Sequence, residues 1–360
     1  MPHSRRAFSS LFVAGRLRGW QSGGWKIVYR AAPDGIWIDL AVSAGAVAAV
    51  GMETARSKPV AVVWEGAWSV RTLPERPVSL FLSATAWLAA ESGLWRSADL
   101  CRTWKLVHKA EGLLRVYFVT EAHGYALGKE KTILETGDGG NTWTPVAAAA
   151  EPATHASYTA YHWVEFVTPR AGIITGASRP PRSGRTGAIP AWRDPQADLR
   201  RKEWPGASLT LETRDGGLTW KHSSTSLFGR ITRVRSAKDG KGLALVEFHD
   251  AFDWPSEVFS IDLRSGRSER VFRRQDRAVT DLLLFPGGRA VVAAVKPPED
   301  PASSTLGAVH LLTTEDLTEW REMPLPEPLR AGRVWLGTHP DGTLWALLDT
   351  GIVLRRALTG

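Results

Sequence analysis

One eight-residue pattern constrains the fold of this 360-residue chain more than any other feature. The pattern is Ser/Thr-x-Asp-x-Gly-x-Thr-Trp, and residues 136–143 and 213–220 match it in full. Residues 97–104 match except that Cys101 replaces the glycine, and residues 313–320 keep the threonine and tryptophan but have a glutamate in place of the aspartate. The two full copies lie between short runs typical of β-strands. The pattern therefore predicts a repeated turn between neighbouring strands.

The chemistry of the pattern is that of a tight turn. An aspartate side chain accepts hydrogen bonds from backbone N–H groups across the turn, and glycine adopts a positive φ without steric cost. The threonine suits the outgoing strand, and the tryptophan buries a large apolar surface. We therefore assign a structural role, rather than a catalytic one, to Asp99, Trp104, Asp138, Gly140, Trp143, Asp215, Gly217, Trp220 and Trp320.

The pattern resembles the Asp-box, or BNR repeat. This repeat is typical of sialidases, sortilin-type receptors, xyloglucanases and the photosystem II stability/assembly factor family. In those families it forms the turn between the third and fourth strands of β-propeller blades. The resemblance thus implies an all-β propeller, whereas it indicates little about function.

Aligning the tryptophans that open each fourth strand divides the chain into seven units, which predicts a seven-bladed β-propeller of four-stranded antiparallel blades. An N-terminal strand in residues 20–30 is expected to complete the C-terminal blade, because closing the ring removes an exposed sheet edge. We expect a flexible basic leader, 1–19, and one propeller domain, 20–360. The predicted blades 1 to 7 are 34–74, 75–110, 111–150, 158–226, 229–274, 277–326 and 330–360.

Composition narrows the classes of partner and site. The formal net charge is +8, which favours acidic partners. A single cysteine excludes an intrachain disulfide and a cysteine-based metal site. No apolar run is long enough for a transmembrane helix. We expect a monomer with no cofactor and no bound metal.

The N-terminus resembles the start of a twin-arginine export signal, carried by Ser4, Arg5, Arg6 and Phe8. The apolar stretch that follows is short and lacks a cleavage site of small residues. We expect a cytoplasmic protein by default, with export or membrane association left open.

Long segments gather on the face opposite the Asp-box turns. They are residues 178–206, 249–256 and 296–305 of blades 4 to 6 and the connection 147–157, and we call them the crown. Long loops often carry function, although they are also tolerated as plain surface insertions. The first segment is rich in arginine, which suits an acidic protein surface, and its scarcity of aromatic residues argues against nucleic acid. Its candidate binding residues are Arg179, Arg182, Arg185, Arg193, Arg200 and Arg201.

The first strands of the blades carry unexpected polar residues. We align Trp37, Arg115, Trp163, Arg233, Asp281 and Arg333 at one position, and Asp39, Tyr117, Glu165, Arg235 and Trp335 two residues later. These side chains are expected near the mouth of the central channel. Arg115, Arg233 and Arg333, with Arg235 and Trp335 beside them, could bind an anion. The alternative is that the arginines pair with Asp39, Glu165 and Asp281 and fill the channel.

Two functional classes remain open. Sialidases use three arginines, a tyrosine nucleophile and a glutamate, so a hydrolase would use Tyr117, Glu165 and Asp281 at the channel mouth. The Arg-Ile-Pro segment of sialidases is absent, and sialidases have six blades. The chain is most similar to the photosystem II stability/assembly factor family, through residues 119–143 above all. That resemblance implies a non-enzymatic scaffold that binds another protein through an arginine-bearing face. A sialidase-like or other glycan-directed hydrolase, acting on an anionic glycan, is the alternative.

Overall fold

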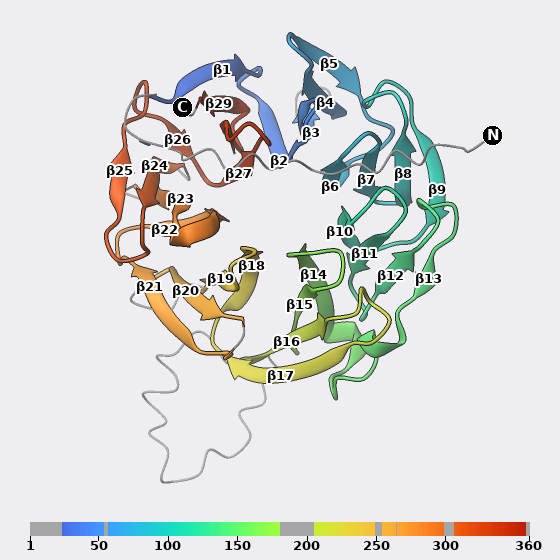
Figure 1. The fold of residues 1–360 in the computed structure, drawn as a ribbon. Helices are drawn as coiled ribbons and strands as arrows, with labels where there is room; N and C mark the ends of the chain where they lie inside the picture. The colour runs from blue at the N-terminus through green and yellow to red at the C-terminus, as the bar shows by residue number, and fades with distance from the viewer. Residues whose placement is uncertain are drawn as a thin grey trace, which may run out of the picture.

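Seven antiparallel sheets surround a central axis in the computed structural model (Figure 1). The structure describes residues 24–53, 57–180, 205–248, 254–263, 265–298 and 306–357. In each blade the strands follow one another from the axis to the rim, so the first strand is innermost and the fourth is outermost. This arrangement confirms the predicted all-β, seven-bladed propeller of four-stranded blades.

Blades 1 to 6 are each built from four consecutive strands. Blade 1 contains β2 (Gly35–Val42), β3 (Val47–Glu53), β4 (Lys58–Trp64) and β5 (Trp68–Thr72). Blade 2 contains β6 (Pro77–Leu82), β7 (Ala86–Ala90), β8 (Gly93–Ser97) and β9 (Lys105–Lys109). Blade 3 contains β10 (Leu113–Phe118), β11 (Gly124–Gly128), β12 (Ile133–Thr136) and β13 (Thr144–Pro145). Blade 4 contains β14 (Thr159–Phe166), β15 (Gly172–Ser178), β16 (Gly206–Thr213) and β17 (Lys221–Leu227).

The remaining blades complete the ring. Blade 5 contains β18 (Arg230–Ser236), β19 (Lys241–Glu247), β20 (Ser256–Asp262) and β21 (Ser268–Arg273). Blade 6 contains β22 (Ala278–Leu284), β23 (Ala290–Lys296), β24 (Gly307–Thr314) and β25 (Arg321–Met323), and β26 (Arg330–Ala331) also pairs with β24. Blade 7 contains β27 (Val334–Thr338), β28 (Leu344–Leu348), β29 (Ile352–Arg356) and β1 (Lys26–Arg30). Short 3₁₀ turns are η2 (Ala147–Ala149), η3 (Ala156–Tyr158) and η4 (Pro286–Gly288).

The N-terminal strand β1 closes the ring, as predicted. It pairs antiparallel with β29, from Lys26 opposite Arg355 to Arg30 opposite Ile352, and Figure 1 shows the blue strand beside the dark red one. Trp25, just before β1, is buried in the hydrophobic cluster of blades 6 and 7. Closure therefore gives β29 a hydrogen-bonding partner and buries a large aromatic ring.

The hydrophobic core lies between adjacent blades. The second strands β7, β11 and β28 are buried at every residue. A second strand is covered on both faces by neighbouring blades, so its sequence is a continuous apolar run rather than an alternating one. For example, Tyr125 and Leu127 of β11 pack against Leu209 and Leu211 of the next blade.

A register shift occurs near the start of the first strand in six of the seven blades. The shifts lie between residues 37 and 39, 77 and 79, 113 and 115, 161 and 163, 231 and 233, and 279 and 281. The residues that follow the shifts are equivalent: Asp39, Ser79, Arg115, Trp163, Arg233 and Asp281. Our alignment of Trp37 and Arg333 with this set is therefore wrong by two residues, because Trp37 precedes the bulge of β2 and Arg333 precedes β27. In blade 7 the equivalent residue is Trp335, opposite Leu347.

The predicted leader, residues 1–19 with Ser4, Arg5, Arg6 and Phe8, lies outside the described residues. Its boundary with the propeller remains a prediction. Within the described ranges, no helix has the length and hydrophobicity that crossing a membrane requires.

Candidate functional site

The polar residues of the first strands form a ring near one end of the central channel. Each first strand begins at the end of the propeller where the fourth strand of the preceding blade ends. The second strands end at the same side. The register shifts come within the first four residues of β2, β6, β10 and β18, so the residues that follow them lie close to this end. This is the face on which the crown was predicted, and we call it the crown face.

Two buried aspartates of this ring connect adjacent blades. Asp39 of blade 1 accepts a hydrogen bond from the backbone N–H of Leu80 in blade 2, with Oδ2 and N 2.9 Å apart. Asp281 of blade 6 accepts the equivalent bond from Leu336 in blade 7, also at 2.9 Å. Each aspartate also accepts the N–H of its own following residue. Both carboxylates are therefore largely satisfied by the backbone, and they fix one blade to the next.

Trp163 is the member of the ring on which three arginines converge. Its side chain is 2% exposed, and its Nε1 donates a 2.8 Å hydrogen bond to the carbonyl of Val234 in blade 5. The guanidinium carbons of Arg115, Arg233 and Arg235 lie 4.2, 4.6 and 4.9 Å from its ring centroid. Such cation–π contacts hold guanidinium groups against an aromatic face. The convergence of arginines from blades 3 and 5 is thus organised by one tryptophan.

Each arginine also lies near a carboxylate. Arg115 is 3.6 Å from Asp39 and Arg233 is 3.4 Å from Asp281. The distance from Arg235 Nη1 to Glu165 Oε2 is 3.3 Å. Arg333, just before β27, forms an ion pair with Glu247 at the end of β19, which also accepts a bond from Thr232. Four arginines thus face four carboxylates.

Solvent exposure is uneven within this set. The side chains of Arg115 and Arg333 are 20% and 34% exposed, whereas that of Arg233 is 13% exposed. The Nε atoms of Arg115 and Arg333 are buried and donate no hydrogen bond to any described residue. Arg333 is therefore the member most accessible to a ligand.

The pKa shifts follow from burial and from the neighbouring charges. Burial, with added repulsion from Arg333 and Arg115, lowers the pKa of Arg233 to about 10, although Asp281 opposes the shift. Burial raises the pKa of Glu165 above its usual range. For Arg235, burial is outweighed by Glu165 and Asp281, which raise the pKa. Arg233 is still a cation at neutral pH because its pKa remains well above 7.

The residues predicted for a hydrolase hold other contacts. Tyr117 is packed in an aromatic stack with Phe166, and burial followed by the charge of Glu165 raises its pKa. Glu165 is paired with Arg235, and Asp281 is engaged by backbone N–H groups. A tyrosine nucleophile needs a lowered pKa or an adjacent free base. This geometry does not provide either at Tyr117.

The crown is only partly described. Arg179 donates a hydrogen bond to the carbonyl of Gly229 in the connection to blade 5, and Trp335 packs against the cluster of blades 1 and 7. Trp254 borders β20, and the guanidinium carbon of Arg273 lies 3.9 Å from its ring centroid. The predicted binding residues Arg182, Arg185, Arg193, Arg200 and Arg201 lie outside the described residues.

The turns with the Asp-box pattern are at the opposite face. Asp138 accepts hydrogen bonds from the N–H groups of Asn141 and Thr142 and from the hydroxyls of Thr136 and Thr142. Asp99 and Asp215 make the corresponding bonds in blades 2 and 4. Hydrogen bonds led by those from Thr142 lower the pKa of Asp138 to about 2.

The blade 6 turn differs from the sequence alignment. Asp316, rather than Glu315, accepts the bonds from Thr318, and Thr314 takes the place of the first threonine. The turn is one residue shorter than those of blades 3 and 4, so the alignment of residues 313–320 is wrong by one position. Trp320 nevertheless keeps its contact with the neighbouring blade, through a 3.0 Å bond from Nε1 to the carbonyl of Val271.

The glycines of two turns dock onto the preceding blade. Gly140 has a φ of 79°, and a Cβ at this position would overlap with the ring of Trp87 in blade 2. Gly217, with a φ of 94°, lies in the same way against the hydroxyl of Tyr125 in blade 3. Trp143 and Trp220 pack in the hydrophobic clusters of the same junctions. These contacts agree with a structural role for the turns.

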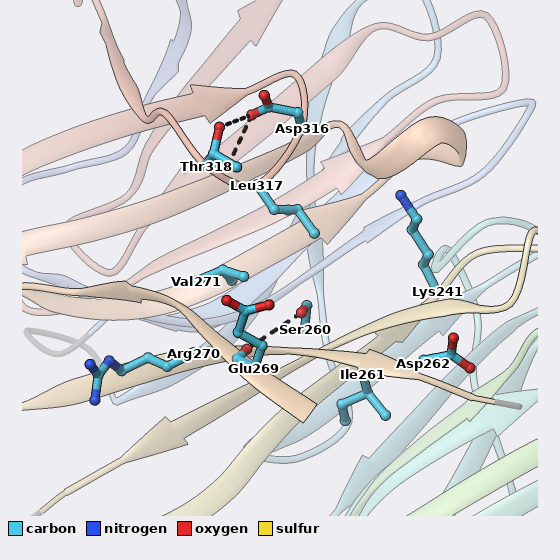
Figure 2. Close-up of a pocket in the computed structure, with 10 residues that line it drawn as sticks. All are labelled: Lys241, Ser260, Ile261, Asp262, Glu269, Arg270, Val271, Asp316, Leu317 and Thr318. Carbon is cyan, nitrogen blue, oxygen red and sulfur yellow. Dashed lines mark hydrogen bonds between the residues drawn. The ribbon is translucent and has the colours of Figure 1, made fainter. Parts of the chain in front are cut away.

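A pocket of about 410 Å³ opens between blades 5 and 6 (Figure 2). It lies at the turn face, since Asp316, Leu317 and Thr318 line one side. None of the predicted site residues lines it. Figure 2 shows Leu317 pointing toward the β20–β21 hairpin and Arg270 pointing away from the turn. Its lining combines Lys241 with acidic side chains, which does not indicate one class of ligand.

Sequence reasoning missed Glu247 and Thr232. Glu247 ends a second strand and Thr232 lies at a bulge, and neither belongs to the pattern by which the first strands were aligned. The ring itself could have been recognised in the sequence. A polar residue or a tryptophan recurs at the equivalent position of the first strands, directly after the bulge where one is present.

Comparison with known proteins supports the fold. Residues 92–178 match the family model described as photosynthesis system II assembly factor YCF48. A structure of YCF48 bound to D1 peptide has a TM-score of 0.59 at 14% identity, over 92% of this chain and 96% of that chain. YCF48 from Cyanidioschyzon merolae has a TM-score of 0.60 at 15% identity, over 92% and 98%.

An enzyme shares the fold as well. The GH74 xyloglucanase from Xanthomonas campestris has a TM-score of 0.61 at 13% identity, over 94% of this chain but 54% of that chain. No curated protein sequence matches the chain. At these identities the structural likeness concerns the fold alone. The chain is accordingly a BNR-type, seven-bladed β-propeller like that of the photosystem II assembly factor YCF48.

Proposed function

We propose that this protein is a non-enzymatic scaffold that holds a protein partner on its crown face. In this proposal, the arginines at the channel mouth bind carboxylates of an acidic partner surface. The similarity to an assembly factor supports the first part, since a YCF48 structure is described as bound to D1 peptide. The net charge of +8 supports an acidic partner.

The arrangement of Arg333 and Arg115 is the observation that carries the proposal. Their side chains are 34% and 20% exposed at the channel mouth, and each is near one carboxylate, Glu247 for Arg333 and Asp39 for Arg115. A guanidinium group binds a carboxylate with two parallel hydrogen bonds, one of which uses Nε or a second Nη. A partner carboxylate at the mouth would bind the solvent-exposed part of these guanidinium groups, beside their pairs with Glu247 and Asp39.

The test begins with affinity capture of the partner from the native host, followed by measurement of its binding constant. We expect Arg333→Ala to weaken binding by about tenfold, the loss of about 1.4 kcal/mol from one charge-assisted contact. Arg321→Ala is the matched control, because Arg321 follows the blade 6 turn at the opposite face and is 75% exposed. Equal affinity of the two variants would contradict the proposal.

A combined variant separates the scaffold from the hydrolase alternative. Changing Tyr117 to Phe and Glu165 to Gln together should leave partner binding nearly unchanged. In a hydrolase the same pair of changes would abolish turnover of sialylated or other anionic glycans. Measurable glycan hydrolysis by the wild-type protein, lost in this variant, would overturn the non-enzymatic assignment.

A further inference from the structure

The outer strand of blade 4, β17, differs from the other outer strands. It pairs with β16 over seven consecutive residues without a register break, from Lys221 opposite Glu212 to Leu227 opposite Gly206. Six of its seven residues are exposed, and Figure 1 shows it along the rim of the ring. Among the described residues its backbone is paired on one edge only. Its outer edge therefore presents a row of backbone donors and acceptors.

The other outer strands are shorter than β17, and several have interrupted pairings. β13 and β25 have two and three residues. The pairings of β1, β9 and β21 are interrupted by register shifts, and β5 has five residues. Short strands, bulges and charges are the usual means by which proteins blunt a sheet edge. β17 has one charged end, Lys221, followed by His222 and a run of serine and threonine.

We propose that the outer edge of β17 binds an extended peptide segment of a protein partner as a fifth strand of blade 4. Strand addition of this kind obtains affinity from backbone hydrogen bonds and specificity from alternate side chains. It deepens the proposed function, and rests on it, by naming the part of the partner that the scaffold holds.

The side chains of β17 indicate which peptide fits. Ser224 and His222 lie opposite Leu209 and Leu211, on the face that packs toward blade 3, and His222 is 2.8 Å from Glu151. Ser223 lies on the other face and is hydrogen bonded to Thr210. Small hydroxyl side chains on both faces leave room for β-branched residues of an incoming strand.

Lys221 adds a charge preference. It is exposed and forms no ion pair with any described residue, so an acidic residue opposite it would form a cross-strand pair. The other end of β17, Leu227, lies beside Gly206, where the chain returns from the crown segment. A partner held on the crown face could thus extend a segment along the rim toward Lys221.

The probe is an acetylated, amidated peptide of sequence Glu-Thr-Val-Ser-Val-Thr-Glu, which places a glutamate near Lys221 in either strand direction. Its control carries proline at the central position, which removes a backbone donor. We expect backbone amide exchange of alternate residues in 221–227 to slow by about tenfold at saturating probe and not with the control peptide. No slowing at millimolar probe, or slowing at another outer strand instead, would overturn the proposal.

Two pairs of variants make the result specific. Neighbouring N–H groups of a strand point to opposite edges, so only one of Ser223→Pro and Ser224→Pro should disturb pairing with β16 and lower Tm. The other proline variant should keep its Tm but should no longer bind the probe peptide. Lys221→Ala should weaken probe binding severalfold, whereas Lys105→Ala, at the same place after Trp104 in blade 2, should not.

The remaining outcomes also decide the question. Concentration-dependent protection of β17 without probe, together with dimerisation, would replace the peptide by a second copy of the chain and overturn the proposal. Arg333→Ala should leave probe binding unchanged. If Arg333→Ala captures the partner as well as wild type while the probe still protects β17, the proposed function fails and the binding edge of β17 stands. If the proline variant no longer binds the probe but captures the partner as well as wild type, the proposal for β17 fails and the proposed function stands.

Discussion

At the scale of single residues, charge is used here mainly to connect backbone segments. Asp138 is exposed yet accepts four hydrogen bonds within its own turn, while Asp39 and Asp281 are buried and join neighbouring blades. The same residue type thus serves local turns at one face and contacts between blades at the other. Hydrogen bonds to the ionised form explain why the pKa of Asp138 is low.

The turn aspartates should make stability depend on acid pH. An aspartate of the unfolded chain has a pKa of about 3.9, whereas that of Asp138 in the folded protein is about 2. Its contribution is therefore fully present above the unfolded pKa and is lost as the pH falls through the folded value. We expect Asp138→Asn to lower Tm by a few degrees at pH 7. The difference from wild type should disappear near pH 2, and a difference that is constant with pH would contradict this account.

At the scale of elements, the first strands carry the contacts between blades near the crown face. A bulge near the start of each of six strands turns a polar residue or tryptophan toward the neighbouring strand. Asp39 and Asp281 accept the backbone N–H groups of Leu80 and Leu336 in the next blade. Trp163 makes the corresponding contact in the opposite direction, because its Nε1 donates to the carbonyl of Val234. Bulges are a known means of redirecting a side chain without ending a strand.

Removing one of these contacts should weaken the whole propeller. Asp281→Ala leaves Arg233 without its carboxylate and the N–H groups of Leu282 and Leu336 without an acceptor. We expect a loss of about 3 to 5 kcal/mol in the free energy of unfolding, as for other broken buried ion pairs. Denaturant titration measures it. Asp276→Ala, which removes an exposed partner of Arg277, should change stability by less than about 0.5 kcal/mol.

At the scale of the whole molecule, the first and last described strands pair in blade 7. β1 supplies the fourth strand and Trp25 enters the cluster formed by β28, β29 and blade 6. The interface between blades 1 and 7, where Trp37 and Trp345 share one hydrophobic cluster, also joins distant parts of the chain. The integrity of the ring therefore depends on β1 and on this interface. The same closure holds Arg333 of blade 7 next to Glu247 of blade 5 at the channel mouth.

Closure can be tested by truncation and by a point change. Deleting residues 1–30 removes β1 and exposes the edge of β29, so we expect aggregation or loss of cooperative unfolding. Trp25→Ala should cost about 3 to 5 kcal/mol in the free energy of unfolding, as for other buried tryptophans. Deleting residues 1–19 is the matched control and should leave Tm unchanged. A large effect of this shorter deletion would move the predicted domain boundary toward the N-terminus.

The repeat and its tryptophans were enough to predict the blade number, the antiparallel order and the closing strand. Turn chemistry is local, so Asp138 and Gly140 can be recognised from their neighbours in the sequence. The blade 6 turn was misplaced by one residue because Asp316 and Glu315 are equally plausible acceptors until the backbone is seen.

The sequence by itself therefore determined the architecture of this protein, since a propeller is a sum of local hairpins with repeated signals. The tertiary structure decided which polar residues meet. Bulges that leave no mark in the residue types shift the register of the first strands, so Asp39 rather than Trp37 is the equivalent of Arg115. Contacts across blades, such as Arg333 with Glu247 or the three arginines around Trp163, join residues far apart in the chain. Only the closed ring brings them together.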